Sequence, residues 1–323
     1  MKALKFHAPG RPEVVNVPLP EAGEGEVRLK ILGAATCPHW EMHYMSGEPM
    51  APGLPITFPG LPGRPGHEAM GVIDSLGPGV EGFNEGDRVA LWTEQGFERP
   101  GAFAEYMIAR AHNILLLPEH TQPQEVASLE LAMCVQSSFD QILNIFPIEG
   151  TRFGVNGLGP GGLVAVQLAR AYGASEVVAF DPLESRRELA LSLGADRALD
   201  PLDAEAFPQD RFSPEALDIS IECTGLAPAV EYVMHRTRSV VALFGVLRED
   251  VRFGFKHWAN ALHLLGYGPQ TRGAGERALE HVLSGKLDLS VLISETMPIE
   301  KYPEAIDLLK QKEAIKVMFV FGE

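Results

Sequence analysis

Two cysteines and one histidine carry the most suggestive chemistry in this 323-residue chain. Cys37 lies in ATCPHWEMHY, His67 and Glu68 lie in RPGHEAMGVI, and Cys134 lies in LELAMCVQSS. Two thiolates and one imidazole can hold a zinc ion and leave its fourth tetrahedral position open, which distinguishes catalytic from structural zinc sites. Free cysteines are also common as buried apolar residues, so the residue types alone leave both interpretations open.

A second chemical feature is the glycine-rich sequence GLGPGG, which begins at Gly157 and includes Gly159 and Gly162. It follows the apolar run RFGVN and precedes the helical run LVAVQLARAYGA, a strand-to-helix context in which such a motif binds a dinucleotide. The first glycine permits a tight turn, the second admits the pyrophosphate, and the third lets helix and strand pack closely. A glycine-rich turn without a ligand is the alternative.

The nature of the dinucleotide depends on Asp181, which ends the next predicted strand 24 residues after Gly157. An acidic residue near this place binds the ribose 2′-hydroxyl, so the sequence favours NAD over NADP. Arg186 and Arg187 keep NADP open, because an arginine beyond this strand can accept a 2′-phosphate. Asp181 could instead cap the helix that begins near Glu184.

The elements that must position these groups fall into three stretches. Residues 1–125 contain short alternating runs broken by Gly and Pro, which predict a mainly antiparallel β domain. Residues 126–269 alternate strands such as EVVAFD with helices such as ESRRELALSLGA, which predicts an α/β domain with a doubly wound parallel sheet. Residues 270–323 contain two amphipathic helices and the apolar strand IKVMFVF, which we expect to return to the first domain.

Composition restricts the partners and the location. The chain has 27 basic and 43 acidic residues and a formal net charge of −16, which disfavours binding to nucleic acid or anionic membranes. We therefore expect small-molecule partners. The chain shows no long apolar run and no secretory leader, and its three cysteines do not suit a disulfide framework, so we expect a cytoplasmic protein.

The chain resembles the medium-chain dehydrogenase/reductase superfamily, and within it the zinc-dependent alcohol and polyol dehydrogenase branch, over nearly its whole length. The resemblance is carried by GHEAMGVIDSLGPGVEGFNEGDRVA, GAFAEYMIA, GLGPGG, IECTG and EAIDLLKQKEAIKVMFVF. It implies a GroES-like catalytic domain and a Rossmann domain separated by an active-site cleft, and a homodimer or homotetramer.

The resemblance also implies roles for individual residues. Cys37, His67 and Cys134 would bind one catalytic zinc ion, with Glu68 beside the metal. Glu130 is the alternative third ligand, because polyol dehydrogenases place a glutamate near this position. The family's cysteine-rich lobe is replaced by the short WTEQGFERPGAFAEY, so we expect no structural zinc.

The proton path departs from the family pattern. Relatives carry Ser or Thr two residues after the first cysteine and often His five after it, whereas this chain has His39 and Met42 there. His39 is therefore the candidate for proton transfer, with a surface or supporting histidine as the alternative. Trp40 and Trp92 lie near segments that line the family's substrate pocket, and either could instead be core packing.

These features predict a zinc-dependent oxidoreductase that transfers a hydride between a nicotinamide cofactor and an alcohol or carbonyl substrate. No Lys/Arg cluster marks an anion site in the first domain, which favours a neutral alcohol, polyol or aldehyde. One alternative is a zinc-free quinone or enoyl reductase, against which Cys37, His67 and Glu68 argue. The other is a non-redox lyase, cyclase or regulatory binder on the same fold, which the altered residues at 39 and 42 leave open.

Overall fold

The chain folds into two compact units in the computed structural model, which describes residues 1–50, 53–203, 207–259 and 261–321. Unit 1 comprises Met1–Met133 and Asp288–Glu323, and unit 2 comprises Cys134–Leu287. Both boundaries fall later in the chain than the sequence boundaries at 125/126 and 269/270, so helix α8 (Arg272–Leu283) belongs to unit 2. An amphipathic pattern predicts an apolar face, but it does not identify the core on which that face packs.

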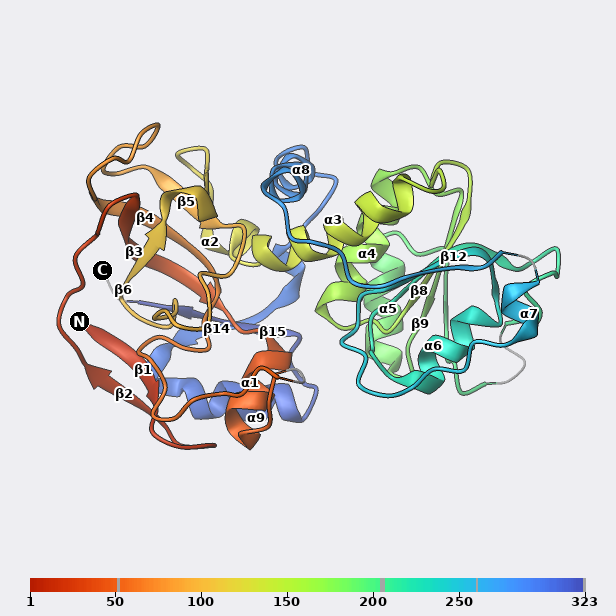
Figure 1. The fold of residues 1–323 in the computed structure, drawn as a ribbon, viewed down its shortest axis with the longest axis horizontal. Coiled ribbons are helices and arrows are strands. Elements are labelled where there is room, and N and C mark those ends of the chain that lie inside the picture. The colour runs from red at the N-terminus through yellow and green to blue at the C-terminus, as the bar shows by residue number, and fades with distance from the viewer. Residues whose placement is uncertain (51–52, 204–206, 260, 322–323) are drawn as a thin grey trace. The chain divides into compact units, whose positions relative to one another are not determined.

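Unit 1 is built on a seven-stranded sheet in the order β14-β15-β3-β4-β5-β7, with β6 also paired to β3. The last strand, drawn blue in Figure 1, pairs antiparallel with β3, drawn red, and therefore returns to the N-terminal part of the chain. Two further strands form a separate hairpin. The strands of this unit are β1 (Lys2–Phe6), β2 (Pro12–Asn16), β3 (Glu26–Ala35), β4 (Glu68–Leu76), β5 (Arg88–Leu91), β6 (Tyr106–Arg110), β7 (Ile114–Leu116), β14 (Ile293–Pro298) and β15 (Lys316–Val320).

Short helices connect these strands. In the central strand β3, the residues Val27, Leu29 and Ile31 are buried and alternate with less buried ones, as expected for a sheet with one face on the core. The helical elements of unit 1 are α1 (Pro38–Ser46), α2 (Pro123–Val126), α9 (Tyr302–Lys310) and three 3₁₀ turns, η1 (Ala111–Asn113), η2 (Ser290–Leu292) and η3 (Ile299–Lys301). Helix α3 (Leu129–Leu143) begins in unit 1 and continues in unit 2.

Unit 2 is a six-stranded sheet in the order β10-β9-β8-β11-β12-β13, and every neighbouring pair in it is parallel. Strands such as β9 are almost continuously apolar and buried, as parallel sheets covered by helices require. The strands are β8 (Arg152–Asn156), β9 (Glu176–Phe180), β10 (Arg197–Leu199), β11 (Leu217–Glu222), β12 (Thr237–Leu243) and β13 (His263–Leu265). The helices besides α3 and α8 are α4 (Pro160–Ala171), α5 (Glu184–Ser192), α6 (Ala227–Met234) and α7 (Phe255–Trp258).

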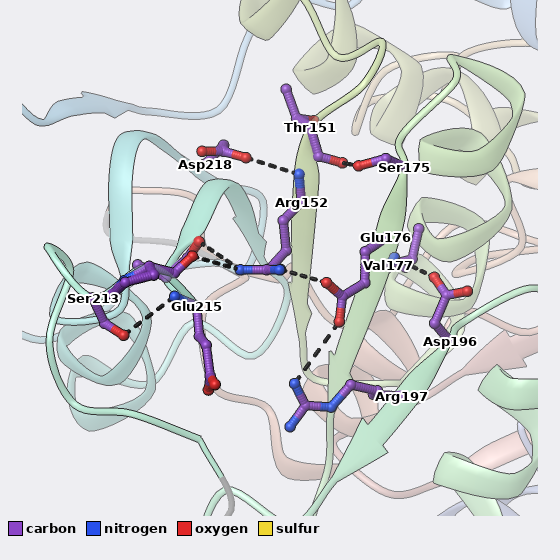
Figure 2. Close-up of polar contacts among 12 residues, drawn as sticks. Thr151, Arg152, Ser175, Glu176, Val177, Asp196, Arg197, Ser213, Glu215 and Asp218 are labelled. Atoms are coloured by element: carbon purple, nitrogen blue, oxygen red, sulfur yellow. Dashed lines mark hydrogen bonds and ion pairs between the residues drawn. The ribbon is translucent and has the colours of Figure 1, made fainter.

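A network of polar side chains ties together the amino ends of the strands in unit 2. Figure 2 shows Arg152, the first residue of β8, between Asp218 on β11 and Glu176 on β9. Glu176 also lies 3.8 Å from Arg197 on β10. The glycine turn lies at the opposite end of this sheet, directly after the carboxyl end of β8, which is the usual place for ligands in such sheets.

Among the residues that the structure describes, no helix is both long enough and apolar enough to cross a bilayer.

Candidate metal and cofactor sites

Cys37, His67 and Glu68 lie together in unit 1. Their candidate ligand atoms are all within 4.8 Å of one another. The pairing of β3 with β4 brings them together, because Ala35 is opposite Glu68 and the chain continues from β3 directly to Cys37. The sheet register therefore places a thiol, an imidazole and a carboxyl at one point.

The ring of His67 is held in one orientation. Its Nδ1 lies 2.9 Å from the carbonyl oxygen of Pro65, so Nδ1 carries the proton and donates it, leaving Nε2 with a lone pair for a metal. Burial lowers the pKa of His67 to about 3, so the imidazole is in the neutral form that a metal requires.

The carboxyl of Glu68 is fully buried and paired with a lysine from the far end of the chain. Lys316 Nζ donates to both carboxylate oxygens, at 2.6 and 2.7 Å, and to the carbonyl oxygen of Thr36 at 2.7 Å. Burial raises the pKa of Glu68, and Lys316 opposes that rise. Oε1 of Glu68 is 4.0 Å from Nε2 of His67, so the carboxylate borders the metal-binding atom while the lysine holds it.

Cys37 completes a donor set that suits zinc. Burial and the neighbouring Glu68 raise the pKa of its thiol, and Lys316 opposes that rise. A bound metal ion deprotonates a coordinating thiol outright, which removes this cost. A sulfur donor, a neutral imidazole and an adjacent carboxylate are groups that zinc binds. The residues present therefore fit the metal.

The two candidates for the third ligand have different surroundings. Oε2 of Glu130, a buried residue in the first turn of α3, lies 3.8 Å from Nε2 of His67. Cys134 lies one turn later, in unit 2, where its sulfur accepts a hydrogen bond from Nε2 of Gln270 at 3.5 Å. Within unit 1, then, Glu130 is the third acidic or thiol group beside the imidazole.

The candidate proton carrier lies on α1. His39 is half-buried, and its ring contacts that of His43 edge to face, with 4.6 Å between ring centroids. His39 also contributes, as the smallest of several causes, to the lowering of the pKa of His67, so the two rings lie near each other. Trp92 is buried and donates its indole N–H to the carbonyl oxygen of His112 at 2.7 Å, which makes it a packing residue.

The glycine turn of unit 2 has the geometry of a dinucleotide site. Gly157 has φ +85°, and a Cβ on Gly162 would lie 1.9 Å from the carbonyl oxygen of Gly157, so neither tolerates a side chain. Gly159 differs, because nothing lies within 4 Å of its Cβ position. The space left open beside Gly159, at the start of α4, fits the approach of a pyrophosphate to the backbone and the helix N-terminus.

Asp181 is joined to this turn. One of its carboxylate oxygens accepts the backbone N–H of Leu158 at 2.8 Å, and the other accepts that of Leu183 at 2.8 Å. Leu183, which has no side-chain cap, occupies the N-cap of α5, so Asp181 is not the capping residue considered from the sequence. Each oxygen keeps a second lone pair, which can accept a hydrogen bond from a hydroxyl group of a ligand.

Sequence reasoning missed Lys316 as a member of the site. It lies 248 residues from Glu68, and only the folded sheet shows that they meet. The available signal was a charged residue inside the apolar strand IKVMFVF, because a lysine in a buried strand requires a buried partner.

Two family models match the chain and together cover more than half of it. The alcohol dehydrogenase GroES-like domain matches residues 23–119, and the zinc-binding dehydrogenase domain matches residues 160–282. The chain is 29% identical to L-threonine 3-dehydrogenase of Pyrococcus horikoshii, over 95% of this chain and 94% of that protein. It is 27% identical to sorbitol dehydrogenase of Halalkalibacterium halodurans, over 98% of each.

Solved structures show the same fold. The alcohol dehydrogenase of Thermus sp. ATN1 has a TM-score of 0.86 at 22% identity, over 99% of each chain. The 2R,3R-butanediol dehydrogenase of Bacillus subtilis has a TM-score of 0.85 at 18% identity, over 99% of each chain. The predicted fold class, a GroES-like domain with a Rossmann domain, is confirmed. The chain belongs to the zinc-dependent alcohol and polyol dehydrogenase branch of the medium-chain dehydrogenase/reductase superfamily, and it is an oxidoreductase that uses zinc and a nicotinamide cofactor.

Proposed function

We propose that this protein interconverts a neutral alcohol or polyol and the corresponding carbonyl compound, with hydride transfer to or from NAD and one catalytic zinc ion per chain. The observation that carries the proposal is the cluster of the half-buried Cys37 with the buried His67 and Glu68, whose donor atoms suit zinc and lie within 4.8 Å of one another. A zinc-free reductase, the alternative considered above, would not need a group of metal-binding side chains at this place.

In this proposal Cys37 and His67 hold the metal, and either Cys134 or Glu130 is the third ligand. The family resemblance supports Cys134, and the distance of 3.8 Å to the imidazole supports Glu130. A bound zinc ion supplies a Lewis acid that lowers the pKa of an alcohol hydroxyl. Pro65, through its carbonyl, fixes the imidazole in the tautomer that presents Nε2.

Glu68 and His39 have different tasks. Glu68, held by Lys316, keeps a negative charge beside Nε2 of His67 and balances the positive charge of the metal site. His39 accepts the hydroxyl proton and passes it toward solvent, because its half-buried ring is accessible where the family's hydroxyl side chain is missing.

The cofactor is bound by unit 2. Gly157, Gly159 and Gly162 form the turn for the pyrophosphate, and Asp181 binds the ribose hydroxyls, which favours NAD. Arg186, whose charge lies close enough to Asp181 to interact with it, is the residue through which NADP would bind. One solved structure of similar fold, from Sinorhizobium meliloti 1021, holds NADP, so both cofactors belong in the assay.

The substrate class follows from charge and from the relatives. The relatives named above act on threonine and sorbitol, which are small molecules with a secondary alcohol. Arg64, the arginine nearest to the site in sequence, is paired with Glu94 at 2.7 Å, so its charge is already balanced. This favours a substrate without an anionic group, such as sorbitol, over one with a carboxylate, such as threonine. A homodimer or homotetramer and a cytoplasmic location stay predictions.

The test is an assay of nicotinamide reduction with a panel of alcohols and polyols, run with NAD and with NADP, before and after removal of zinc. We expect alcohol-dependent reduction of NAD that is lost with the metal and recovered on adding zinc. Activity that survives complete removal of the metal would contradict the proposal. A metal-containing protein that binds NAD but reduces it with none of the alcohols would support the non-redox alternative.

A further inference from the structure

Glu222, the last residue of β11, has a fully buried carboxylate that is bound to the turn directly after it. Its Oε1 accepts the backbone N–H of Thr224 at 2.8 Å and also the hydroxyl of Thr224. Its Oε2 accepts the backbone N–H of Gly225 at 2.9 Å. Burial raises the pKa of Glu222, and these hydrogen bonds oppose that rise, so the turn does for this carboxylate what a basic partner would do.

A carboxylate suits these three donors better than any other side chain of its size. Its two oxygens offer about four lone pairs and carry no hydrogen, whereas an amide has one oxygen and a nitrogen that only donates. Glu222→Gln would therefore place a donor against a donor on one side of the turn. The charge at position 222 holds the turn of Thr224 and Gly225 in one conformation.

The turn held by Glu222 packs on the glycine turn of the cofactor site. A Cβ on Gly157 would lie 2.5 Å from Cγ2 of Thr224 and 3.3 Å from its backbone nitrogen. Because the hydroxyl of Thr224 is bound to Glu222, its methyl group is left facing Gly157. The carboxylate thus determines where one wall of the glycine turn lies.

The same turn contacts the chain that follows β12. Gly225 has φ +73°, and a Cβ on it would lie 2.4 Å from the carbonyl oxygen of Val246. The backbone carbonyl of Glu222 accepts the N–H groups of Phe244 and Gly245, both at 2.9 Å. Glu222 therefore connects the carboxyl ends of the three neighbouring strands β8, β11 and β12.

The strand order indicates what these carboxyl ends receive. The order β10-β9-β8-β11-β12-β13 is that of a doubly wound sheet whose two halves meet between β8 and β11. A dinucleotide binds across this point, with one nucleotide at each half. Gly157 and Asp181 follow β8 and β9, so that half takes the adenosine nucleotide. The turn of Thr224 and Gly225 follows β11 and belongs to the half that takes the nicotinamide nucleotide.

We propose that Glu222 is a positioning residue, which holds the turn of Thr224 and Gly225 in the shape that receives the nicotinamide half of the cofactor. The inference rests on the proposed binding of NAD by unit 2, and it is independent of the zinc site and of the substrate. A residue that only stabilised the fold would affect both halves of the cofactor alike, whereas Glu222 should affect one of them.

The test measures the dissociation constants of NADH and AMP by isothermal titration calorimetry on the full chain. AMP lacks the nicotinamide nucleotide, so it reports on the adenosine half alone. We expect Glu222→Gln to weaken NADH binding by about tenfold, the effect of about one lost hydrogen bond, and to keep AMP binding within about twofold of wild type.

Two further variants accompany Glu222→Gln. Thr224→Val has nearly the same shape as wild type but lacks the hydroxyl, so it should weaken NADH binding by a smaller factor and leave AMP binding unchanged. Asp218→Asn is the matched control. Asp218 lies near the opposite end of the same strand, where it accepts the backbone N–H of Arg152 at 2.9 Å (Figure 2). Its replacement should leave both dissociation constants unchanged.

The outcomes separate this role from a structural one and from the proposed function. Equal weakening of NADH and AMP binding in Glu222→Gln, or unchanged NADH binding, would overturn the proposal. If Glu222→Gln does not fold, an unchanged ratio of the two constants in Thr224→Val overturns it. A wild type that binds NADH but oxidises no alcohol contradicts the proposed function, while the ratio still decides the role of Glu222. A wild type that binds neither ligand overturns both.

Discussion

Replacing Lys316 by methionine should destabilise unit 1 by about 3–5 kcal/mol, the usual cost of leaving one member of a buried ion pair without its partner. Lys316 is 1% exposed and Glu68 0%, and Nζ contacts both carboxylate oxygens. Methionine keeps most of the length of the side chain but has no charge. The carboxylate of Glu68 and the carbonyl of Thr36 would therefore both lose a donor.

An exposed pair in the same unit provides the matched control. Lys2 and Glu300 are joined at 2.7 Å, close to the distance in the buried pair, but they are 53% and 47% exposed. Lys2→Met should leave the free energy of unfolding nearly unchanged, because water screens the interaction. The two substitutions are chemically identical, so the difference between them measures the effect of burial.

The assay is urea denaturation of the zinc-saturated protein, followed by tryptophan fluorescence. Two of the three tryptophans, Trp40 and Trp92, lie in unit 1, whereas Trp258 lies in unit 2 and is 70% exposed, so the signal reports mainly on the unit that changes. If Lys316→Met lowers the free energy of unfolding by no more than Lys2→Met does, the reasoning is refuted. A Glu68→Leu, Lys316→Met double variant should be more stable than Lys316→Met, since it leaves no charge unpaired.

The effect of pH on Lys316→Met has a definite sign. Burial raises the pKa of Glu68, and the variant lacks the lysine that opposes this rise. A group whose pKa is higher in the folded protein than in the unfolded chain stabilises the fold below its unfolded pKa and loses that contribution as pH rises. The deficit relative to wild type should therefore be smaller at about pH 5 than at about pH 8.

Three further predictions concern the cofactor turn, a histidine pair and the third zinc ligand. Gly162→Ala should prevent stable folding of unit 2, because its Cβ would lie 1.9 Å from a carbonyl oxygen, and thermal melts would show this loss. Gly159→Ala should fold normally, because its Cβ position is open, but an NAD titration should show that it loses affinity for NAD. Burial lowers the pKa of His257, so the stability that the neutral imidazole contributes should be lost as pH falls below about 6.5, the pKa of histidine in the unfolded chain. The urea midpoint of His257→Gln should therefore depend less on pH in that range than the midpoint of wild type. Glu130→Gln and Cys134→Ser should differ in zinc content, and the variant that loses the metal identifies the third ligand.

Much of the fold could be predicted because local patterns and global topology agree. Unit 2 follows from apolar strands that alternate with helices, and the turn at Gly157 follows from glycines whose spacing has steric reasons. Helix α8 was harder, because amphipathicity does not say which unit a helix joins. The boundary between the units at Met133 could not be predicted from the sequence either, since one continuous helix, α3, passes through it.

The candidate site was predictable only in part, because its supports come from distant segments. Cys37 and His67 are suggested by residue type and family resemblance, whereas the contacts of Lys316 with Glu68 depend on sheet order. The contact of Arg64 with Trp40 could not be predicted either, because nothing local indicates that an arginine before a proline will lie beside an indole ring.

The most direct test of the zinc site is the metal content of the purified protein. Elemental analysis of wild type and Cys37→Ser, prepared side by side, requires no knowledge of the substrate. We predict about one zinc ion per wild-type chain, as a single catalytic site requires, and its loss in the variant. A wild-type protein without zinc, or a Cys37→Ser variant that retains it in full, would contradict the metal site on which the proposed reaction depends.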